Sequence, residues 1–221
     1  MFEHDYMLSM PVFWLFVAFT CLLSLGYFWG RRKNKQLFLS VFNELMEIVK
    51  PDDQTFTNIG GTIGYHANLI VKKKGPISRV DATITFLPRQ SWLYLPISKF
   101  LIMKHDRLFI TVYLKDKLPG EGHLIEKKHA GFRAPKITNV DRLNREDVRW
   151  GSHNFYLYYE NLKVRDHFRK FMDENPDAGL IRHIAIVPDE KKGFIFVIPR
   201  KKMVGRYVEP VYRWFPRILA G

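Results

Sequence analysis

The chain has 221 residues, of which 35 are Lys or Arg and 22 are Asp or Glu, so its formal net charge is +13. Apolar residues make up 47% and aromatic residues 15%, a composition that excludes a disordered basic tail. A positive field of this size favours anionic partners, either acidic lipid headgroups or nucleic-acid phosphates. The only cysteine is Cys21, which excludes a disulfide framework and a cysteine-held zinc site.

A long uncharged segment lies near the N-terminus. Residues 7–29 contain no charged side chain, and four basic residues follow at once: Arg31, Arg32, Lys33 and Lys35. A membrane-spanning helix needs about 20 mostly apolar residues, so residues 7–30 are expected to span a membrane. A cleaved signal peptide is the alternative, but its positive charge would precede a shorter apolar core, and no Ala-x-Ala-like cleavage site follows here.

The four basic residues after the segment predict its orientation. Lys and Arg are retained on the cytoplasmic side of a membrane, where they also contact headgroups. Residues 1–6 are therefore expected to be a short extracytoplasmic tail, and the chain after residue 30 to be cytoplasmic. The membrane is expected to be the plasma membrane in a prokaryote and the endoplasmic reticulum in a eukaryote.

The segment after the span has helical periodicity. In residues 31–50, Leu37, Val41 and Leu45 recur at spacings of four, which places them on one face. Pro51 cannot continue a helix, so it marks the end. We expect a juxtamembrane amphipathic helix that is continuous with the span or separate from it.

Alternation of apolar and polar side chains predicts an antiparallel sheet. Residues 66–73 and 79–87 alternate on either side of the turn signal Gly75-Pro76, which predicts a hairpin with one wet face. Further strands are expected at residues 107–115, 154–159, 181–187 and 194–198, and helices at residues 90–104 and 164–174. These elements predict an α+β domain over residues 51–200.

Three segments lack a regular pattern. Residues 52–64 contain three glycines and are expected to form a loop. The polar residues 116–149 are expected to form a long excursion, with a short helix at 141–148. Residues 201–221 are expected to form a basic, aromatic tail.

No catalytic pattern is present. The glycine-rich residues 60–64 lack the following Gly-Lys-Ser/Thr of a phosphate-binding loop and precede a predicted strand. The eight histidines show no HExxH spacing, and no Gly-x-Ser-x-Gly elbow is found. We therefore expect no catalytic residue, no metal site, no cofactor and no enzymatic activity.

Basic clusters are the strongest candidates for a functional surface. Candidate contacts to an anionic surface or to RNA are Lys72, Lys73, Lys74, Lys127, Lys128, Arg133, Lys191, Lys192, Arg200, Lys201, Lys202, Arg206, Arg213 and Arg217. Aromatic residues interleave with the last of these basic residues, and the candidate interfacial aromatics are Tyr207, Tyr212, Trp214 and Phe215. Aromatic rings lie at headgroup level in membranes and stack on RNA bases, while packing of these rings on the domain is the alternative.

Three segments also carry a family resemblance. Residues 27–35 lead into a helix with Phe42-Asn43-Glu44, residues 82–114 contain Phe86-Leu87-Pro88-Arg89-Gln90, and residues 181–199 end in Phe196-Val197-Ile198-Pro199. Their order resembles the cytosolic domain of the calumin family, coiled-coil-containing membrane proteins that accompany the Sec translocon in the endoplasmic reticulum. The chain would be a minimal version without the family's acidic lumenal segment and its basic coiled coil, so ribosome contact through that coiled coil does not transfer.

These observations lead to three functional hypotheses. The first is a single-pass accessory factor for membrane-protein biogenesis, which binds a ribosome, a nascent chain, a Sec-type translocon or a small multipass membrane partner from the cytoplasmic face. The second is a structural module that its charge holds against acidic lipids. The third is a membrane-tethered enzyme of unidentified chemistry. No small-molecule substrate is indicated.

Overall fold

The computed structural model describes residues 10–72, 75–101, 105–130, 137 and 140–219. Its strands are β1 (Asp53–Asn58), β2 (Gly64–Ile70), β3 (Ile77–Thr85), β4 (Arg107–Leu114), β5 (Gly122–Glu126), β6 (Asn144–Trp150), β7 (His153–Tyr159), β8 (Ile181–Val187) and β9 (Lys192–Val197). Its helices are α2 (Pro11–Val49), α3 (Tyr94–Leu101), α4 (Leu162–Glu174) and α5 (Val204–Leu219), with 3-10 turns η1 (Lys127–His129) and η2 (Val140–Arg142).

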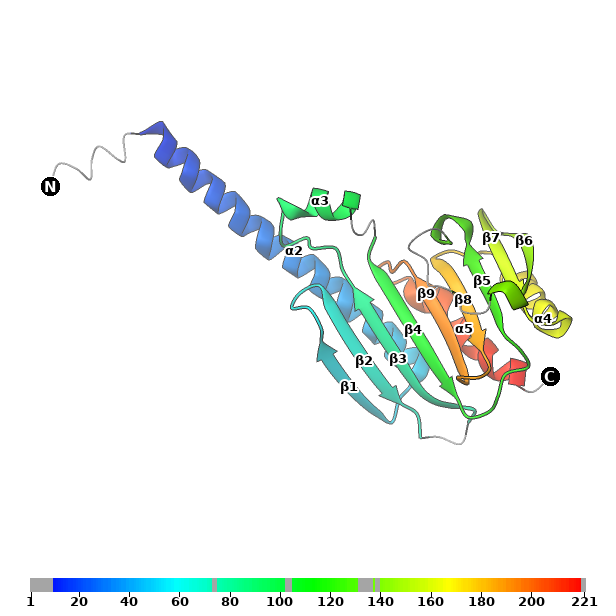
Figure 1. The fold of residues 1–221 in the computed structure, drawn as a ribbon. Helices are drawn as coiled ribbons and strands as arrows, with labels where there is room; N and C mark the ends of the chain where they lie inside the picture. Colours follow the sequence, from blue (N-terminus) through cyan, green and yellow to red (C-terminus); the bar gives the residue numbers. More distant parts are fainter. Residues whose placement is uncertain (1–9, 73–74, 102–104, 131–136, 138–139, 220–221) are drawn as a thin grey trace.

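The nine strands form one antiparallel sheet, and a long N-terminal helix precedes them in the chain (Figure 1). The strand order is β1-β2-β3-β4-β9-β8-β5-β7-β6. The last hairpin, β8–β9, is inserted between β4 and β5. It therefore joins strands β1 to β4 on one side to strands β5 to β7 on the other. The predicted α+β class, with antiparallel strands and interspersed helices, is confirmed.

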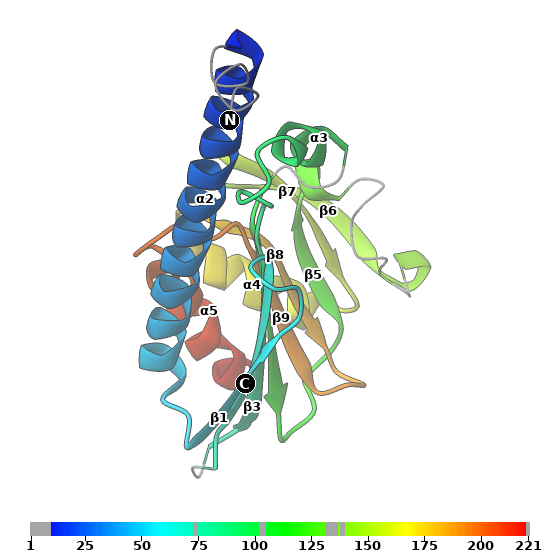
Figure 2. The ribbon, with the colours of Figure 1, turned by 90° about the vertical axis from the view of Figure 1, so that its left-hand side faces the viewer.

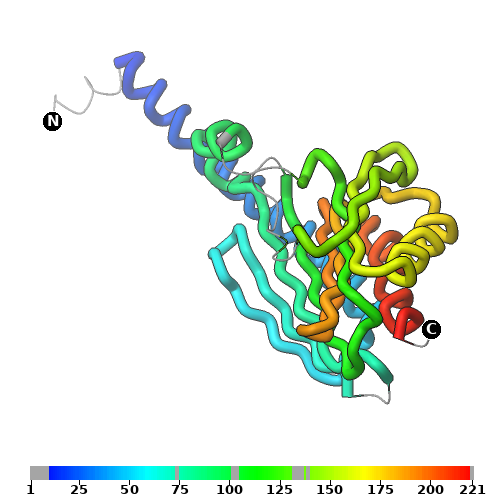
Figure 3. Tube along the Cα trace, turned by 45° about the vertical axis from the view of Figure 1, so that its right-hand side comes forward, coloured from blue at the N-terminus to red at the C-terminus, as the bar shows by residue number. Residues whose placement is uncertain are grey.

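Helix α2 is a single rod of 39 residues. Pro11 lies in its first turn, where a missing N–H is not needed. Lys50 ends it in the left-handed conformation, with its N–H bonded to the Met46 carbonyl, and Pro51 follows. The predicted juxtamembrane helix is therefore the second half of this same helix. The first half projects away from the sheet (Figure 3).

The core lies between one face of the sheet and three helices. The second half of α2, with α5 and α4, covers this face (Figure 2). Val41, Phe42 and Leu45 of α2 are at most 3% exposed. The start of α5 and the turn before it are held to α2 by polar contacts, since the Ser40 hydroxyl accepts the Lys202 N–H at 2.9 Å and the Glu44 carboxylate accepts the Gly205 N–H at 2.8 Å.

The strands with clear alternation form as predicted. β2 and β3 pair antiparallel with Ala67 opposite Ala82, and both side chains are fully buried. β8 and β9 form the second predicted hairpin, with Ile184 opposite Ile195. The helix predicted at residues 164–174 is α4, which buries Phe168 and ends before Pro176. In β2, β3 and α4 one buried face imposes the periodicity that the sequence shows, whereas β8 is buried at five of its seven positions.

The predicted loop at residues 52–64 is wrong in its first half. Asp53–Asn58 forms β1, which pairs with β2 along its whole length at the edge of the sheet. All six of its side chains are exposed, so no alternation between apolar and polar residues marks the strand.

The predicted excursion at residues 116–149 contains two strands. β5 lies inside the sheet between β8 and β7 and is buried at all five positions, so it too lacks alternation. The short helix predicted at residues 141–148 is wrong, because Asn144–Trp150 forms the other edge strand, β6. Pairing with β7 overrides the local preference of this polar segment.

The predicted tail at residues 201–221 is largely a helix. α5 packs against the sheet through Val204, Val208, Val211 and Ile218, which recur at helical spacing. The basic and aromatic residues of this segment are thus divided between an exposed side and a buried side.

Candidate membrane-proximal site

The first half of α2 is apolar and uncovered. A window of 18 residues in this helix has a mean hydropathy of 1.9, and 6% of that window is buried. Leu15, Phe16 and Leu22 are each more than half exposed, at 69%, 68% and 54%. In the described part of the chain, this is the one helix long and apolar enough to cross a membrane. Length and composition suit a membrane span and also suit a signal sequence.

Small residues form the face of α2 that meets the domain. Gly26, Gly30 and Asn34 recur at spacings of four and are buried. The chain between β3 and α3 crosses this face. A Cβ on Gly26 would lie 2.6 Å from the Trp92 ring, and one on Gly30 would lie 2.2 Å from the Arg89 carbonyl. Only glycine permits this approach, so the contact depends on the absence of side chains at both positions.

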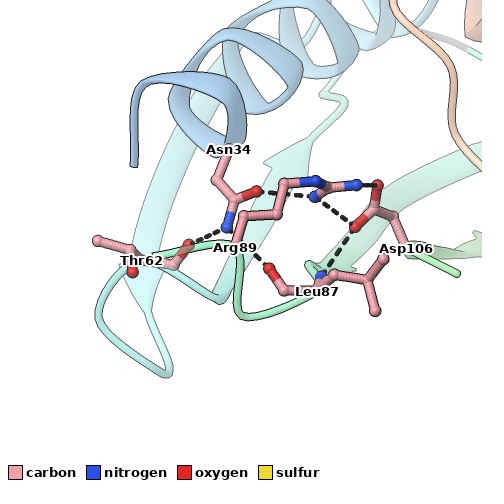
Figure 4. A network of polar contacts seen from close by, with 5 residues as sticks. All are labelled: Asn34, Thr62, Leu87, Arg89 and Asp106. Carbon is pink, nitrogen blue, oxygen red and sulfur yellow. Dashed lines mark hydrogen bonds and ion pairs between the residues drawn. The ribbon is translucent and has the colours of Figure 1, made fainter. Parts of the chain in front are cut away.

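A buried polar network is centred on Asn34 (Figure 4). Asn34 is 1% exposed, and its Nδ2 donates to the Thr62 carbonyl at 3.2 Å and to the Leu87 carbonyl at 3.0 Å. Its Oδ1 accepts from Nη1 of Arg89 at 2.8 Å. Both donors and the acceptor of the amide are therefore paired, which offsets the cost of burying it.

Asp106, the residue immediately before β4, completes this network. Arg89 donates two hydrogen bonds to its carboxylate, at 2.9 and 2.7 Å, and the Leu87 N–H donates a third at 2.8 Å. A bidentate pair of this kind fixes both distance and orientation. The network joins α2 to the ends of β3 and β4, and so holds the apolar helix at one angle to the sheet. We call Gly26, Gly30, Asn34, Arg89 and Asp106 the junction.

Sequence reasoning did not find the junction. Gly26, Gly30 and Asn34 did carry a readable signal, because small residues at spacings of four indicate close helix packing and an uncharged Asn interrupts the basic run. No local pattern links Arg89 to Asp106. They are 17 positions apart and meet only because β3 and β4 are neighbours.

Some of the basic candidate residues lie at the end of the sheet where α2 leaves the domain. We call this the anchor end of the sheet. Seven exposed residues lie there: Arg31, Arg32, Lys33, Lys35, Arg200, Lys201 and Lys202. Three of them follow β9, whose last residue, Val197, is opposite Leu108 near the start of β4. Nζ of Lys33 lies 3.8 Å from the centroid of the Trp29 ring, a cation–π contact beside the apolar run.

Other predicted basic residues lie at the opposite, far end of the sheet. Lys72 and Lys191 are exposed at the two hairpin turns there. The turns adjoin, since Lys115 donates its N–H to the Pro76 carbonyl at 2.8 Å and its own carbonyl accepts from Nζ of Lys191 at 3.0 Å. Acidic residues are interspersed, and Lys192 pairs with Glu190.

The remaining predicted basic residues are scattered or lie outside the described residues. Lys127 pairs with Asp147 at 2.7 Å, and Lys128 next to it is exposed. The exposed side of α5 carries Arg206, Arg213 and Arg217, of which the last two pair with Glu209 and Glu174. Lys73, Lys74 and Arg133 fall outside the described residues.

The candidate interfacial aromatics turn toward the core. Tyr207, Trp214 and Phe215 are at most 9% exposed, and Tyr212 is partly buried against the core. The Trp214 ring lies 4.9 Å from both Phe168 and Phe171 of α4, centroid to centroid. The first three rings are core residues, which matches the alternative that these aromatics pack on the domain. The helical spacing that separates them from the arginines directs them toward the sheet.

A buried pair of histidines links β5 to β8. Nδ1 of His123 lies 3.3 Å from Nε2 of His183, and Nε2 of His123 lies 2.9 Å from a carboxylate oxygen of Glu121. Burial, with a smaller contribution from the nearby His123, lowers the pKa of His183 to about 3. Burial also lowers the pKa of His123, against the opposing effect of Glu121. Among the described residues, no group of three His, Cys, Asp or Glu side chains is placed to hold a metal ion.

We expect His183 to make the domain sensitive to acid. Its pKa is about 3 in the folded state and near 6.5 when unfolded, so the unfolded state binds more protons between these values and stability falls as the pH falls through this window. The loss for one such group is about 2 kcal/mol between pH 7 and pH 5. His183→Gln should therefore reduce the loss of unfolding free energy between these pH values. His105→Gln, at an exposed position, should keep the wild-type decline. An equal decline in the His183 variant would contradict the assignment.

No protein-family model and no curated protein sequence matches the chain. Its function must therefore be inferred from the fold, the junction and the distribution of charge.

Proposed function

We propose that this protein is a single-pass, membrane-anchored accessory factor in membrane-protein biogenesis. Its basic α+β domain works at the cytoplasmic face, where it binds a ribosome, a nascent chain or a Sec-type translocon. The observation that carries the proposal is the junction. One helix passes from an exposed apolar half into the core, and the network of Asn34, Arg89 and Asp106 fixes it there.

The junction favours a retained span over a cleaved signal sequence. Gly26 and Gly30 lie within the apolar run and already contact the folded domain. Cleavage beyond the run would uncover the Trp92 ring and the backbone at Arg89. The rest of the same helix supplies Val41 and Leu45 to the core, so the apolar half belongs to the fold.

The charges support a cytoplasmic domain. Arg31, Arg32 and Lys33 are exposed directly after the apolar run, where positive charge is retained on the cytoplasmic side. The anionic lipids of that leaflet attract each nearby Lys or Arg by about 1 kcal/mol. With the anchor end against the headgroups, the far end of the sheet is directed toward partners in the cytoplasm.

Charge reversal at the far end tests the proposed ribosome contact. We expect the double variant Lys72→Glu/Lys191→Glu of the full-length protein, solubilised in detergent, to co-sediment with ribosomes more weakly than wild type. Each lost phosphate contact removes about 0.7–0.9 from the slope of log affinity against log salt, so the slope should fall by about 1.5. Both residues are exposed, and circular dichroism checks that losing the Lys191 bond to the Lys115 carbonyl leaves the fold intact.

A matched variant controls for the change in net charge. Lys163→Glu/Lys170→Glu alters the charge equally at two exposed positions of α4. It should keep most of the wild-type co-sedimentation. If both double variants lost binding equally, a local contact at the far end would be contradicted, and the attraction would come from net charge alone.

The second candidate is a structural module apposed to lipid. The observation in its favour is the basic surface at the anchor end, where four exposed Lys and Arg residues follow the apolar half of α2 and three more lie at residues 200–202, of which Lys202 contacts Ser40 of the same helix. Such a protein would bind acidic vesicles and would not co-sediment with ribosomes at any salt concentration. The triple variant Arg200→Glu/Lys201→Glu/Lys202→Glu should weaken vesicle binding in either case, so ribosome binding distinguishes the two candidates.

A further inference from the structure

Helix α3 and the two residues before it present apolar side chains to solvent. Phe100 is 89% exposed, Leu93 66% and Ile97 51%, and Trp92 is also exposed. Ser98 is 3% exposed, so a polar side chain of this helix faces the protein while the apolar ones face outward. A surface helix of a domain in water has the opposite arrangement. An apolar patch of this kind indicates a surface that contacts something other than water.

The patch adjoins the apolar half of α2. The chain entering α3 passes directly over α2, so that Trp92 lies against Gly26 and the centroids of its ring and the Trp29 ring are 6.4 Å apart. Figures 1 and 2 show α3 beside α2 at the point where α2 leaves the domain. The exposed apolar surfaces of the two helices are therefore continuous.

The length of α2 sets the depth of this contact. Residues 11–29 of the helix rise about 28 Å at 1.5 Å per residue, and the hydrocarbon core of a bilayer is about 30 Å thick. A span this short needs its whole apolar run, so Gly26 and Trp29 lie at the boundary between hydrocarbon and headgroups. Trp92 touches this part of α2 and lies at the same depth.

The charges around α3 fit this depth. Residues 82–105 contain no Asp or Glu, and Lys99 is the one charged residue within α3. On α2, Arg31 follows Gly26 by five residues, or about 7.5 Å along the axis. If Gly26 lies at the edge of the hydrocarbon, this distance places Arg31 among the headgroups. Helices in the interfacial plane bury their apolar faces about 5–10 Å deep and keep basic residues among the headgroups.

We propose that Trp92, Leu93 and α3 form a second membrane contact, in which lipid at the cytoplasmic interface covers the exposed face with Ile97 and Phe100. The inference rests on the proposed membrane span. A single helix leaves a domain free to rotate about the helix axis, whereas a contact to one side of it fixes that rotation. The span, the junction and α3 together then determine which side of the sheet faces the membrane.

Spin-label accessibility tests the proposal in the full-length protein. The labels are placed at Phe100→Cys, at Phe16→Cys in the span and at Leu162→Cys at the start of α4, each in a Cys21→Ser background that removes the only native cysteine. Phe16 and Leu162 are 68% and 59% exposed, so labels fit at both. The protein is reconstituted in vesicles of phosphatidylcholine and phosphatidylglycerol. Accessibility to oxygen, which concentrates in lipid, is compared with accessibility to a water-soluble nickel chelate.

We expect the label at Phe100 to favour oxygen, as the label at Phe16 does, and the label at Leu162 to favour nickel. If Phe16 favours oxygen while Phe100 favours nickel, the second contact is overturned and the span stands. If all three favour nickel, the span fails, and the inference fails with it. A label at Phe100 that is shielded from both reagents would place the face against protein and would also contradict lipid as its occupant.

Discussion

Asp106→Ala is expected to lower the stability of the domain by about 3 kcal/mol, because it leaves a partly buried guanidinium without its counter-charge. Arg89 would lose both hydrogen bonds to the carboxylate, and the Leu87 N–H would lose its acceptor. For a domain of this size the melting temperature should fall by about 6–12 °C. Thermal unfolding of the full-length protein in detergent, followed by tryptophan fluorescence at neutral pH, measures the change.

A surface ion pair provides the control for this prediction. Asp189 is 83% exposed and pairs with Lys117 at 3.2 Å. Exposed pairs contribute less than about 1 kcal/mol, so Asp189→Ala should leave the melting temperature close to wild type. If Asp106→Ala also unfolded at the wild-type temperature, the network would not hold α2 to the sheet.

Gly30→Ala is expected to destabilise the junction by about 3 kcal/mol, although alanine favours helices over glycine by about 1 kcal/mol. The added Cβ would lie 2.2 Å from the backbone of Arg89, which cannot move without pulling its side chain away from Asn34 and Asp106. Besides a lower melting temperature, we expect trypsin to cleave after Arg89 faster than in the wild type, because the displaced loop exposes this bond.

A second glycine tests whether the effect is local. Gly205 lies in the first turn of α5, where a Cβ would meet Glu44 at 3.4 Å or more, an ordinary contact distance. Gly205→Ala should therefore be neutral or slightly stabilising. Equal behaviour of the two alanine variants would show that the close approach at Gly30 does not determine the stability of the junction.

The sequence predicts strands most clearly where one face is buried and the other is exposed. β2, β3 and β4 have the core on one side and alternate clearly, so their positions to within two or three residues and the first hairpin are predictable. β1 is exposed at every position and β5 is buried at every position, and neither alternates. Whether such a segment joins a sheet depends on neighbours distant in sequence, which composition and period do not show.

The candidate functional residues follow the same division. The basic run after the apolar segment is visible in the sequence because charge is a local property, and its members are exposed in the structure. The pairing of Arg89 with Asp106 depends on the register of β3 and β4. The direction of the Trp214 and Phe215 rings depends on how α5 packs, which interleaved charges and rings cannot reveal.

Salt-dependent co-sedimentation of the wild-type protein with ribosomes tests the proposed function most directly. The full-length protein is solubilised from membranes in detergent, mixed with purified ribosomes and centrifuged over a salt series from about 50 to 200 mM, where phosphate contacts are most strongly screened. We predict co-sedimentation at the lowest salt concentration, with a steep loss across the series. Recovery of all the protein in the unbound fraction at the lowest salt concentration would contradict ribosome binding and leave the lipid-apposed module as the function to test next.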